Sequence, residues 1–427
     1  MNVRFHIITL FPEYFDSPLQ CGLIGKARQK DILDFNLINP RNFALDRHKS
    51  VDDKPYGGGP GMVMLMDPLV RALKTLPAKC RKILLTPKGF PLSQRKAAML
   101  SREEDLALVC GRYEGIDARI EELFELEHLS VGDFVLNGGE AAALCLIEAV
   151  SRYVPGFMGR QESTGEESFS AGLLEYPHYT RPEEYESLQV PQVLLTGDHA
   201  RIARWRREKA LENTLEYRPE LLSEKKLQPE DISYLRNLPR SCPGRNLNIA
   251  LVHHPVKNKT GQECTTSLTN LDIHDIGRVC ATYGLGQYFL CTPLEDQRAL
   301  ADRLISHWIK GAGAEANPDR SRALSGIRVC SSLEEVVRNI SQETGVHPVV
   351  IATRASGTGN ILCRDIRSLL AEKPVLMILG TGYGLSAQVI DKADYVLNPV
   401  RLLARYNHLS VRSAASILVD RILGDFA

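Results

Sequence analysis

The sequence predicts an α/β protein in which two parallel-sheet domains flank a small helical segment. Near both ends of the chain, short apolar and β-branched runs alternate with helical stretches, which is typical of a parallel sheet covered by helices. Between residues 176 and 240, prolines interrupt helical stretches and no run has the convincing composition of a strand. The 427 residues are enough for roughly three domains.

The first α/β domain is expected to comprise residues 1–159. Its strands are predicted at Val3–Leu10, Lys82–Thr86 and Leu106–Cys110. The following run, GRQESTGEESFSAG, has little to bury, so we expect a flexible lid or linker over residues 160–175. The helical domain is then expected at residues 176–240.

A second α/β domain is expected at residues 247–427, after the turn-forming run SCPGRN. Its last helix is predicted over residues 410–423, because Ser410 suits an N-cap and Gly424 a helix end. Its strands are predicted at Asn248–Val252, Tyr288–Cys291, Val349–Thr353 and Val375–Leu379, with a further helix at Leu271–Tyr283.

The composition gives no global attraction to nucleic acid, since 52 lysine and arginine residues balance 52 acidic ones. An RNA-binding surface would therefore need a local concentration of basic residues. No run approaches the roughly 20 apolar residues of a membrane span. The short apolar run Phe5–Phe11 contains His6, unlike a signal peptide. We expect a cytoplasmic protein.

Two kinds of chemistry are disfavoured by the absence of their sequence patterns. The ten cysteines show no C-x-x-C spacing, so we expect reduced, buried thiols and no zinc or other metal site. No G-x-x-x-x-G-K-[ST] pattern occurs, which argues against hydrolysis of nucleoside triphosphates.

Three glycine-bearing segments of the first domain are candidates for ligand binding through the main chain. They are PYGGGPGM at residues 55–62, LVCGRYEGID at 108–117 and SVGDFVLNGGE at 130–140. Glycine lets a ligand approach the backbone closely, and a glycine pair before a helix presents free N–H groups. The second segment follows a predicted strand, where parallel sheets bind ligands, and its Glu114 can accept hydrogen bonds from hydroxyl or ammonium groups. The alternative for each segment is a structural turn.

The run HARIARWRREK, residues 199–209, is a candidate for contact with nucleic-acid phosphates. It contains five basic residues against Glu208, with Trp205 among them. On a helix these side chains form a positive face along which a phosphate backbone can lie, and the indole can stack on a base. A solvated amphipathic helix with Trp205 in the core is an equal alternative.

The run ILGTGYGL, residues 378–385, is predicted to be a strand followed by a glycine loop. Its G-x-G-x-G spacing differs from the G-x-G-x-x-G of dinucleotide-binding folds, and no acidic residue stands about 20 positions later. A nicotinamide-dependent oxidoreductase is therefore a weak alternative.

Residues 1–240 resemble the bacterial tRNA (guanine-N1)-methyltransferases, a family of the SPOUT superfamily. The resemblance rests on blocks that occur in the family's order: LFPEYF, DRHKSVDDKPYGGGPGM, LTPKG, LVCGRYEGID, SVGDFVLNGGE, SRYVPG, LLEYPHYTRP and VPQVLLTGDHARIARWRR. It implies a parallel α/β sheet tied in a trefoil knot, with the methyl donor S-adenosyl-L-methionine held in the knot largely by backbone groups. It also implies a homodimer with shared active sites, and methyl transfer to N1 of guanosine-37 in the anticodon stem-loop of tRNA. DNA is not an expected partner.

The resemblance assigns residues of the first domain to the donor site by position. They are Leu84, Pro87, Gly111, Tyr113, Glu114, Val131, Gly132, Leu136, Gly138 and Gly139.

For the reaction, the resemblance assigns Glu167 as the general base that removes the N1 proton. It assigns Arg152 as the cation that stabilises the negative charge developing on O6. The family commonly has aspartate at the base position, and glutamate adds one methylene and roughly 1.5 Å of reach. Glu166 is the alternative base if the alignment shifts by one residue.

We expect tRNA to contact residues outside the donor site as well. These are Asp52, Gly58, His178, Arg181, Arg201, Arg204 and Arg207. A metal requirement is left open, with Mg²⁺ as the candidate ion.

Residues 247–427 resemble a predicted SPOUT-type RNA methyltransferase domain. The features are NIALVHHPVKNKTG, TSLTNLDIHDIGR, ILGTGYGL and YNHLSVRSAASI. The domain is either a second catalyst or a module that binds donor or RNA without turnover. For the whole chain, the competing hypothesis is an RNA-binding protein with structural glycine loops. Glu114, Arg152 and Glu167 argue against that hypothesis, since a binding module needs no base.

Overall fold

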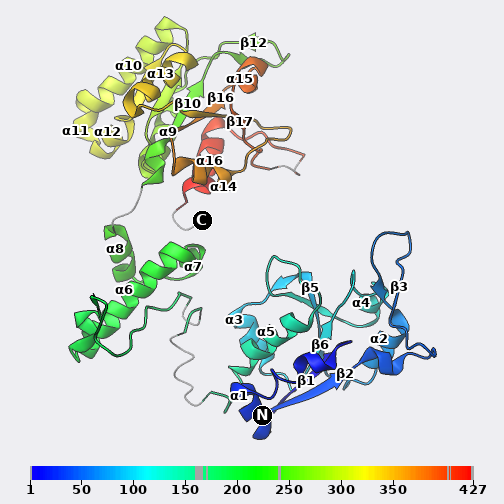
Figure 1. The fold of residues 1–427 in the computed structure, drawn as a ribbon. Helices are drawn as coiled ribbons and strands as arrows, with labels where there is room; N and C mark the ends of the chain where they lie inside the picture. The colour runs from blue at the N-terminus through cyan, green and yellow to red at the C-terminus, as the bar shows by residue number, and fades with distance from the viewer. Residues whose placement is uncertain are drawn as a thin grey trace. The chain divides into compact units, whose positions relative to one another are not determined.

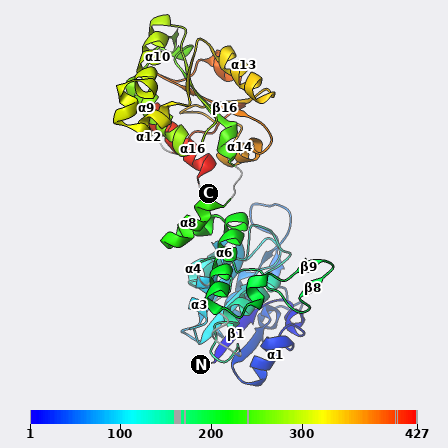
Figure 2. The same cartoon turned by 90° about the vertical axis from the view of Figure 1, so that its left-hand side faces the viewer.

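The computed structural model describes residues 2–158, 167–169, 172–238, 242–401, 403 and 405–424. The chain divides into two compact units, Met1–Thr214 and Leu215–Ala427. Each unit contains a parallel sheet with helices on its two faces, as the sequence predicts (Figures 1 and 2).

The five strands of the first sheet are all parallel, in the order β2-β1-β6-β5-β7. Their bounds are β1 Val3–Ile8, β2 Leu33–Ile38, β5 Arg81–Pro91, β6 Asp105–Cys110 and β7 Glu127–Ser130. The three predicted strands are present, and β5 continues past its predicted end. The sequence analysis does not find β2 and β7, because polar residues such as Asn36 and His128 interrupt their short apolar runs.

Helices cover both faces of the first sheet because apolar residues of β1 point alternately to each side. Phe5 and Ile7 pack with α1, α3 and α5, whereas Ile8 packs with α2 and α4. The helices are α1 Gly22–Gln29, α2 Met66–Leu73, α3 Gln94–Leu100, α4 Arg119–Leu123 and α5 Glu140–Ser151. Smaller elements are η1 Pro12–Phe15, η2 Pro40–Phe43, β3 Asp52–Asp53 and β4 Val63–Met64.

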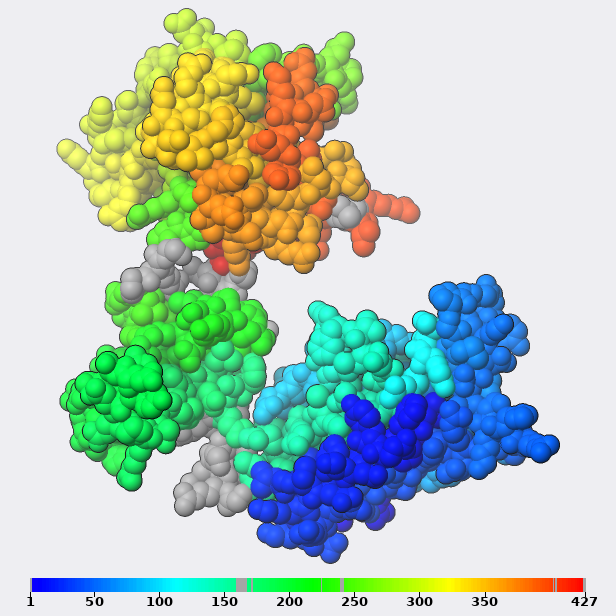
Figure 3. Space-filling view, in the orientation of Figure 1, coloured from blue at the N-terminus to red at the C-terminus, as the bar shows by residue number. Residues whose placement is uncertain are grey.

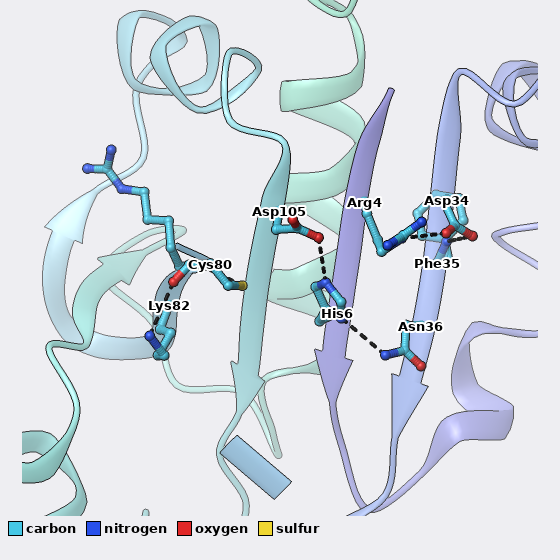
Figure 4. Close-up of polar contacts among 9 residues, drawn as sticks. Arg4, His6, Asp34, Phe35, Asn36, Cys80, Lys82 and Asp105 are labelled. Atoms are coloured by element: carbon cyan, nitrogen blue, oxygen red, sulfur yellow. Dashed lines mark hydrogen bonds and ion pairs between the residues drawn. The ribbon is translucent and has the colours of Figure 1, made fainter. Parts of the chain in front are cut away.

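Side chains as well as backbone groups join three neighbouring strands of this sheet (Figure 4). The buried His6 on β1 lies 2.8 Å from the Asp105 carboxylate on β6 and 3.1 Å from the Asn36 amide on β2. The network is satisfied when Nε2–H donates to Asp105 and Nδ1 accepts from Asn36. A polar residue in the middle of an apolar strand is thereby accommodated without an unpaired ring nitrogen.

Residues 172–238 are mainly helical, but one expectation for them is wrong. The segment contains a small hairpin, β8 Glu184–Tyr185 and β9 Leu188–Gln189, where the sequence predicts no strand. Its turn residues Glu186 and Ser187 both have positive φ, the conformation of a tight hairpin turn. Both strands are exposed, so they have no apolar pattern to reveal them. The remaining elements are η4 Gln192–Leu195, α6 His199–Tyr217, α7 Glu220–Glu224 and α8 Pro229–Asn237.

The second sheet has six parallel strands in the order β14-β13-β10-β16-β15-β17. Their bounds are β10 Leu247–Val252, β13 Tyr288–Cys291, β14 Ile327–Cys330, β15 Val349–Ala352, β16 Val375–Gly380 and β17 Tyr395–Val396. All four predicted strands are present, and the two that were not predicted, β14 and β17, lie at the sheet edges.

Helices also cover both faces of the second sheet: five of the eight pack on one side and two on the other, and the short helix at residues 312–316 belongs to neither apolar cluster. Ser410 caps α16 as predicted, since its hydroxyl accepts a hydrogen bond from the Ser413 N–H. The helices are α9 Asn270–Thr282, α10 Glu295–Lys310, α11 Ala312–Ala316, α12 Pro318–Leu324, α13 Leu333–Thr344, α14 Cys363–Leu370, α15 Ala387–Asp391 and α16 Val411–Leu423. Smaller elements are η5 Pro243–Asn246, β11 Val256–Lys257 and β12 Glu263–Cys264.

The two sheets repeat one topology. The order β2-β1-β6-β5-β7 of the first corresponds to β13-β10-β16-β15-β17 of the second, with β14 added at one edge. In both, the first strand along the chain is central and the last strand lies at an edge. The second α/β domain therefore has the strand arrangement of the first.

The cysteines are all free, but their expected burial is only partly correct. Cys21, Cys145 and Cys242 are exposed, because they lie at a helix start, on the outer face of α5 and before η5. Among the described residues, no cluster of three or more histidine, cysteine or acidic side chains suits a metal ion, and no helix has the length and apolar character to cross a membrane.

The buried His253 predicts a pH-dependent stability for the second unit. Its ring lies directly after β10, and its Nδ1 is 3.1 Å from the Thr266 hydroxyl. Burial lowers the pKa of His253 to about 4, although the Asp272 carboxylate acts in the opposite direction. Between about pH 6.5 and 4 the unfolded chain binds a proton that the folded chain does not. We therefore expect about 3 kcal/mol of stability to be lost as the pH falls through this range.

Urea unfolding of a Trp205→Phe variant, in which Trp308 is the only indole, measures this loss as a function of pH. Substituting His253→Gln should flatten the profile, whereas His347→Gln, at an exposed histidine, should leave it unchanged. An equally steep profile for the two variants would contradict the assignment to His253.

Candidate functional site

A cavity of about 380 Å³ lies at the carboxyl ends of β6 and β7 and beside the middle of β5 in the first unit. The loops that follow these strands enclose it, which is the usual place for a ligand of a parallel sheet. Every residue that the resemblance assigns to the methyl donor lines this cavity: Leu84, Pro87, Gly111, Tyr113, Glu114, Val131, Gly132, Leu136, Gly138 and Gly139.

The loop after β6 has a backbone conformation that brings main-chain groups to the cavity. Tyr113 and Gly115 both have positive φ, at 58° and 132°. The Glu114 N–H donates to the Met62 carbonyl and the Met64 N–H donates to the Gly115 carbonyl, both at 2.9 Å. These bonds attach the loop after β6 to the end of the glycine segment 55–62.

The glycine segment 55–62 is more than a surface turn. Gly57, Gly58, Gly59 and Gly61 all have positive φ, which residues with a side chain rarely adopt. A Cβ on Gly61 would also overlap the Glu114 side chain, whereas the other three glycines face open space. The segment therefore lies against the Glu114 side chain at Gly61 without itself lining the cavity, and Gly58 is accessible.

The glycine pair before α5 allows a close approach of two loops. The Gly139 N–H donates to the Gly111 carbonyl at 3.0 Å, and a Cβ on Gly139 would lie only 2.6 Å from the Cys110 Cα. A Cβ on Gly138 would overlap the Arg112 side chain. Only glycine fits at these two positions. The backbone is therefore exposed here because side chains would overlap with neighbouring groups.

A buried ion pair that the sequence analysis missed holds these loops together. Glu140, only 1% exposed, lies 2.9 Å from the Arg112 guanidinium and accepts a 2.8 Å hydrogen bond from the Thr9 hydroxyl. Arg112 also donates to the Asn137 carbonyl at 3.3 Å, and it lies 4.4 Å from the centre of the Phe11 ring. The carboxyl ends of strands β1 and β6 and the start of α5 thus meet at the Glu140 carboxylate. An acidic residue directly after a glycine pair, where a helix begins, is the signal that could have indicated it.

One predicted tRNA contact lies beside a predicted donor contact. The Tyr113 phenol is close to the Asp52 carboxylate and to Arg41. Burial raises the pKa of Tyr113, and the Asp52 carboxylate raises it further. The phenol therefore stays protonated at neutral pH and can donate a hydrogen bond to Asp52 or to a ligand.

The two residues assigned to the chemistry form an ion pair with each other, Arg152 with Glu167. Neither of them lines the cavity. Arg152 caps the end of α5, whereas Ala142 near its start lines the cavity, so about 15 Å of helix separates them. Glu166, the alternative base, lies outside the described residues.

Comparison with known proteins identifies two families within the chain. Residues 3–224 match the model of the tRNA (Guanine-1)-methyltransferase TrmD family, and residues 246–424 match a SAM-dependent RNA methyltransferase family. A protein of Oleidesulfovibrio alaskensis called tRNA (guanine-N(1)-)-methyltransferase is 55% identical over 99% of this chain and all of its own length. A protein of the same description from Nitratidesulfovibrio vulgaris is 54% identical with the same coverage.

The chain belongs to the tRNA (Guanine-1)-methyltransferase family. A shorter relative, from Synechococcus sp., is 49% identical over 57% of this chain and 98% of its own length. The family thus includes proteins with and without the second α/β domain, and the resemblance stated for each part of the sequence is confirmed.

The predicted basic helix of this family member is α6, and its basic side chains differ in their surroundings. Arg201 and Arg204 are exposed, and Arg204 forms an ion pair with Glu208 at 2.9 Å. Arg206 instead lies over the Tyr176 ring, at 4.8 Å from its centre. Trp205 is half-buried, with its ring 6.3 Å from that of Tyr179, so neither hypothesis for it is fully met. The other expected tRNA contacts here, His178 and Arg181, are exposed.

A second cavity, of about 780 Å³, lies at the carboxyl ends of β15, β16 and β17 in the second unit. Its glycine loop shares two features with the first, positive φ at two positions and main-chain bonds to a neighbouring segment, which runs antiparallel here and parallel in the first domain. Gly382 and Gly384 have positive φ, at 61° and 100°, like Tyr113 and Gly115. The Tyr383 N–H donates to the Lys257 carbonyl at 3.1 Å, and the Lys257 N–H donates to the Gly384 carbonyl at 2.8 Å. The second family domain therefore has a loop built like that of the first domain.

Removing the buried carboxylate should destabilise the first cavity. In a Glu140→Ala variant the Arg112 guanidinium remains without its carboxylate, and we expect a loss of about 3–5 kcal/mol in unfolding free energy. Because Gly138 and Gly139 precede this residue, we also expect affinity for S-adenosyl-L-methionine to fall at least tenfold. Urea denaturation and titration calorimetry measure the two effects.

The matched control is Arg119→Ala, which breaks the exposed ion pair with Asp117. It should have a small effect, since exposed pairs contribute little. Equal stability of the two variants would show that the Arg112–Glu140 pair does not hold the cavity together.

Proposed function

We propose that this chain transfers the methyl group of S-adenosyl-L-methionine to N1 of guanosine-37 in tRNA. The observation on which the proposal depends is that ten residues of strand β5 and of the loops after β6 and β7, assigned by position, line one cavity. The donor supplies an activated methyl group on a sulfonium. Backbone groups beside Gly111, Gly138 and Gly139 are suited to hold it, and Glu114 is suited to bind its hydroxyl or ammonium groups.

The chemistry requires a base, because N1 of neutral guanine has a proton and no free lone pair. Glu167 would accept that proton, and Arg152 would stabilise the negative charge that spreads to O6. Support comes from their ion pair, which keeps a carboxylate and a guanidinium at one place.

We propose that the active site is shared between two copies of the chain. The separation of about 15 Å along α5 between the cavity and Arg152 argues against both acting on one nucleotide within a single chain. In addition, the cavity loop exposes the apolar residues Phe134, Val135 and Leu136, which are typical of a surface that a second subunit covers. A homodimer would bring the cavity of one copy to Arg152 of the other.

The trefoil knot is part of the same proposal. Support comes from main-chain hydrogen bonds that join segments far apart in the sequence: the Glu114 N–H donates to the Met62 carbonyl, and the Gly139 N–H donates to the Gly111 carbonyl. A knotted chain requires contacts of this kind between distant segments.

The tRNA would be bound by exposed and half-buried residues of the helical domain at residues 176–240 and of the first domain. We assign the phosphate contacts to Arg201, Arg204 and Arg207. Asp52, Gly58, His178 and Arg181 would contact the anticodon stem-loop. The lid expected at residues 160–175 lies mostly outside the described residues. The proposal also includes a cytoplasmic location, where the tRNA substrate is found, and assistance by Mg²⁺.

A second function is proposed for residues 247–427, namely donor binding in the larger cavity and methylation of RNA. It is supported by the repeated loop geometry and by the match to a SAM-dependent RNA methyltransferase family. The helix after the last strand is α5 in the first domain and α16 in the second. Arg152 caps the end of α5, whereas Gly424 caps the end of α16. The second domain has no cation at this position, so its acceptor would differ from that of the first.

Replacing the base should separate chemistry from binding. In Glu167→Gln the carboxylate that takes the proton is lost, so we expect single-turnover methylation of tRNA to slow by about 10²- to 10⁴-fold. Donor affinity should change little. Glu166→Gln is the matched control and should retain most of the rate. A slow Glu166→Gln beside an active Glu167→Gln would transfer the role to Glu166, and full activity of both would refute a carboxylate base here.

Removing the positive face of α6 should weaken tRNA binding mainly at low salt. With Arg201, Arg204 and Arg207 all changed to alanine, we expect the slope of log affinity against log salt to become shallower by roughly 2 to 3, one unit per lost phosphate contact. Alanines at Arg303, Arg338 and Arg364 of the second unit are the control with the same change in charge. Equal slopes for the two triple variants would show that α6 does not contact phosphates.

A further inference from the structure

Two chain segments beside the second cavity concentrate positive charge. Residues 353–360 and 397–412 together contain four arginines and one histidine and no acidic residue, in a chain whose formal net charge is zero. Both segments contribute residues to the cavity lining. Arg412 lies within 4 Å of Asp272 and Asp275, which leaves Arg354, Arg401 and Arg405 as the exposed cations of this rim.

The same rim exposes two aromatic side chains. Tyr383, in the glycine loop, is 62% exposed and lines the cavity. Tyr406 is 76% exposed, and its ring lies 5.5 Å from that of His408. A tyrosine this exposed gains little from packing within its own chain, so its flat face is available to a partner.

The rim is fixed by hydrogen bonds at its base. The Asn407 amide donates to the Ala355 carbonyl at 2.7 Å and to the Arg401 carbonyl at 3.0 Å, so one side chain joins the two segments. The Arg421 guanidinium on α16 donates to the Val400 carbonyl at 3.0 Å. In the space-filling view, the orange-red segment near residue 400 projects from the surface of the second unit (Figure 3).

We propose that this rim binds an unpaired stretch of RNA. Phosphates would contact Arg354, Arg401 and Arg405, and one base would stack on Tyr406. A neighbouring nucleotide would then reach the cavity beside Tyr383. Guanidinium groups interleaved with exposed tyrosines match a partner that has both negative charge and free flat faces, which is a single strand. A duplex offers the phosphates, but its bases are already stacked.

This inference rests on the proposed function of residues 247–427, and it adds the form of the acceptor. An acidic protein segment is the competing partner, since it also bears negative charge. It has no base to stack on Tyr406, so the contribution of that ring distinguishes the two.

The test uses the full chain with Arg201, Arg204 and Arg207 changed to alanine, so that α6 does not contribute to RNA binding. The probe is an unstructured oligouridylate with one 2-aminopurine, whose fluorescence is quenched on stacking. We expect Tyr406→Leu to abolish most of the quenching and to weaken binding about tenfold. Tyr406→Phe, which keeps the ring, should behave like the parent.

The arginines are tested by salt dependence. Changing Arg354 and Arg405 to alanine should make the slope shallower by roughly 1.4, whereas alanines at Arg303 and Arg338 should leave it unchanged. Unfolding curves that match the parent confirm that the variants fold. In the chain with α6 intact, methylation of guanosine-37 should stay within twofold for Tyr406→Leu, because Tyr406 belongs to the other unit.

The proposal is overturned if Tyr406→Leu quenches and binds like the parent, or if a duplex of equal length binds as tightly as the single strand. It is also overturned if an acidic peptide binds the rim and the oligouridylate does not. If RNA binds as expected but only one donor molecule is bound per chain, the failure falls on the second donor site and not on the RNA-binding rim.

Discussion

The first cavity depends on one buried ion pair. Glu140 joins three chain segments that are far apart in the sequence, because it accepts a hydrogen bond from Thr9 and forms an ion pair with Arg112. A carboxylate this deeply buried is tolerated only when its partners are in place, because an unpaired charge in the interior is costly. The glycines beside it allow the loops to approach closely enough for the pair to form. Backbone geometry and ion pair therefore require each other.

Much of the fold could be predicted because local composition and burial agree. Apolar runs such as Ile249–Val252 are buried on both faces, so their composition predicts strands. The hairpin at residues 184–189 is exposed, so its composition does not predict strands. The cavity lining was predicted through resemblance, since the sequence alone indicates glycine loops but not that they meet. The Arg112–Glu140 pair was missed because its members are 28 positions apart, and no local pattern links them.

The packing of α5 against the sheet both stabilises the first domain and fixes the distance between the cavity and Arg152. Helix α5 packs along the sheet through Leu146, Ile147 and Val150, so its two ends cannot approach each other. A rigid helix thus places the cavity lining at one end and the Arg152–Glu167 pair at the other. The cavity and the Arg152–Glu167 pair of one chain cannot meet unless α5 bends. A second copy of the chain can bring its own Arg152–Glu167 pair to the cavity, and this is the physical basis of the shared site that we propose.

The repeated loop conformation has a consequence for molecules designed against this protein. Both cavities contain a loop with two positive-φ residues, so a compound that binds mainly to the main chain of such a loop would have affinity for both. The loops differ in the side chain that precedes the second positive-φ residue. It is Glu114 before Gly115 in the first domain and Tyr383 before Gly384 in the second. A cationic substituent would favour the carboxylate, whereas an aromatic substituent would favour the phenol. The cavity volumes, about 380 and 780 Å³, offer a second means of selectivity between the two domains.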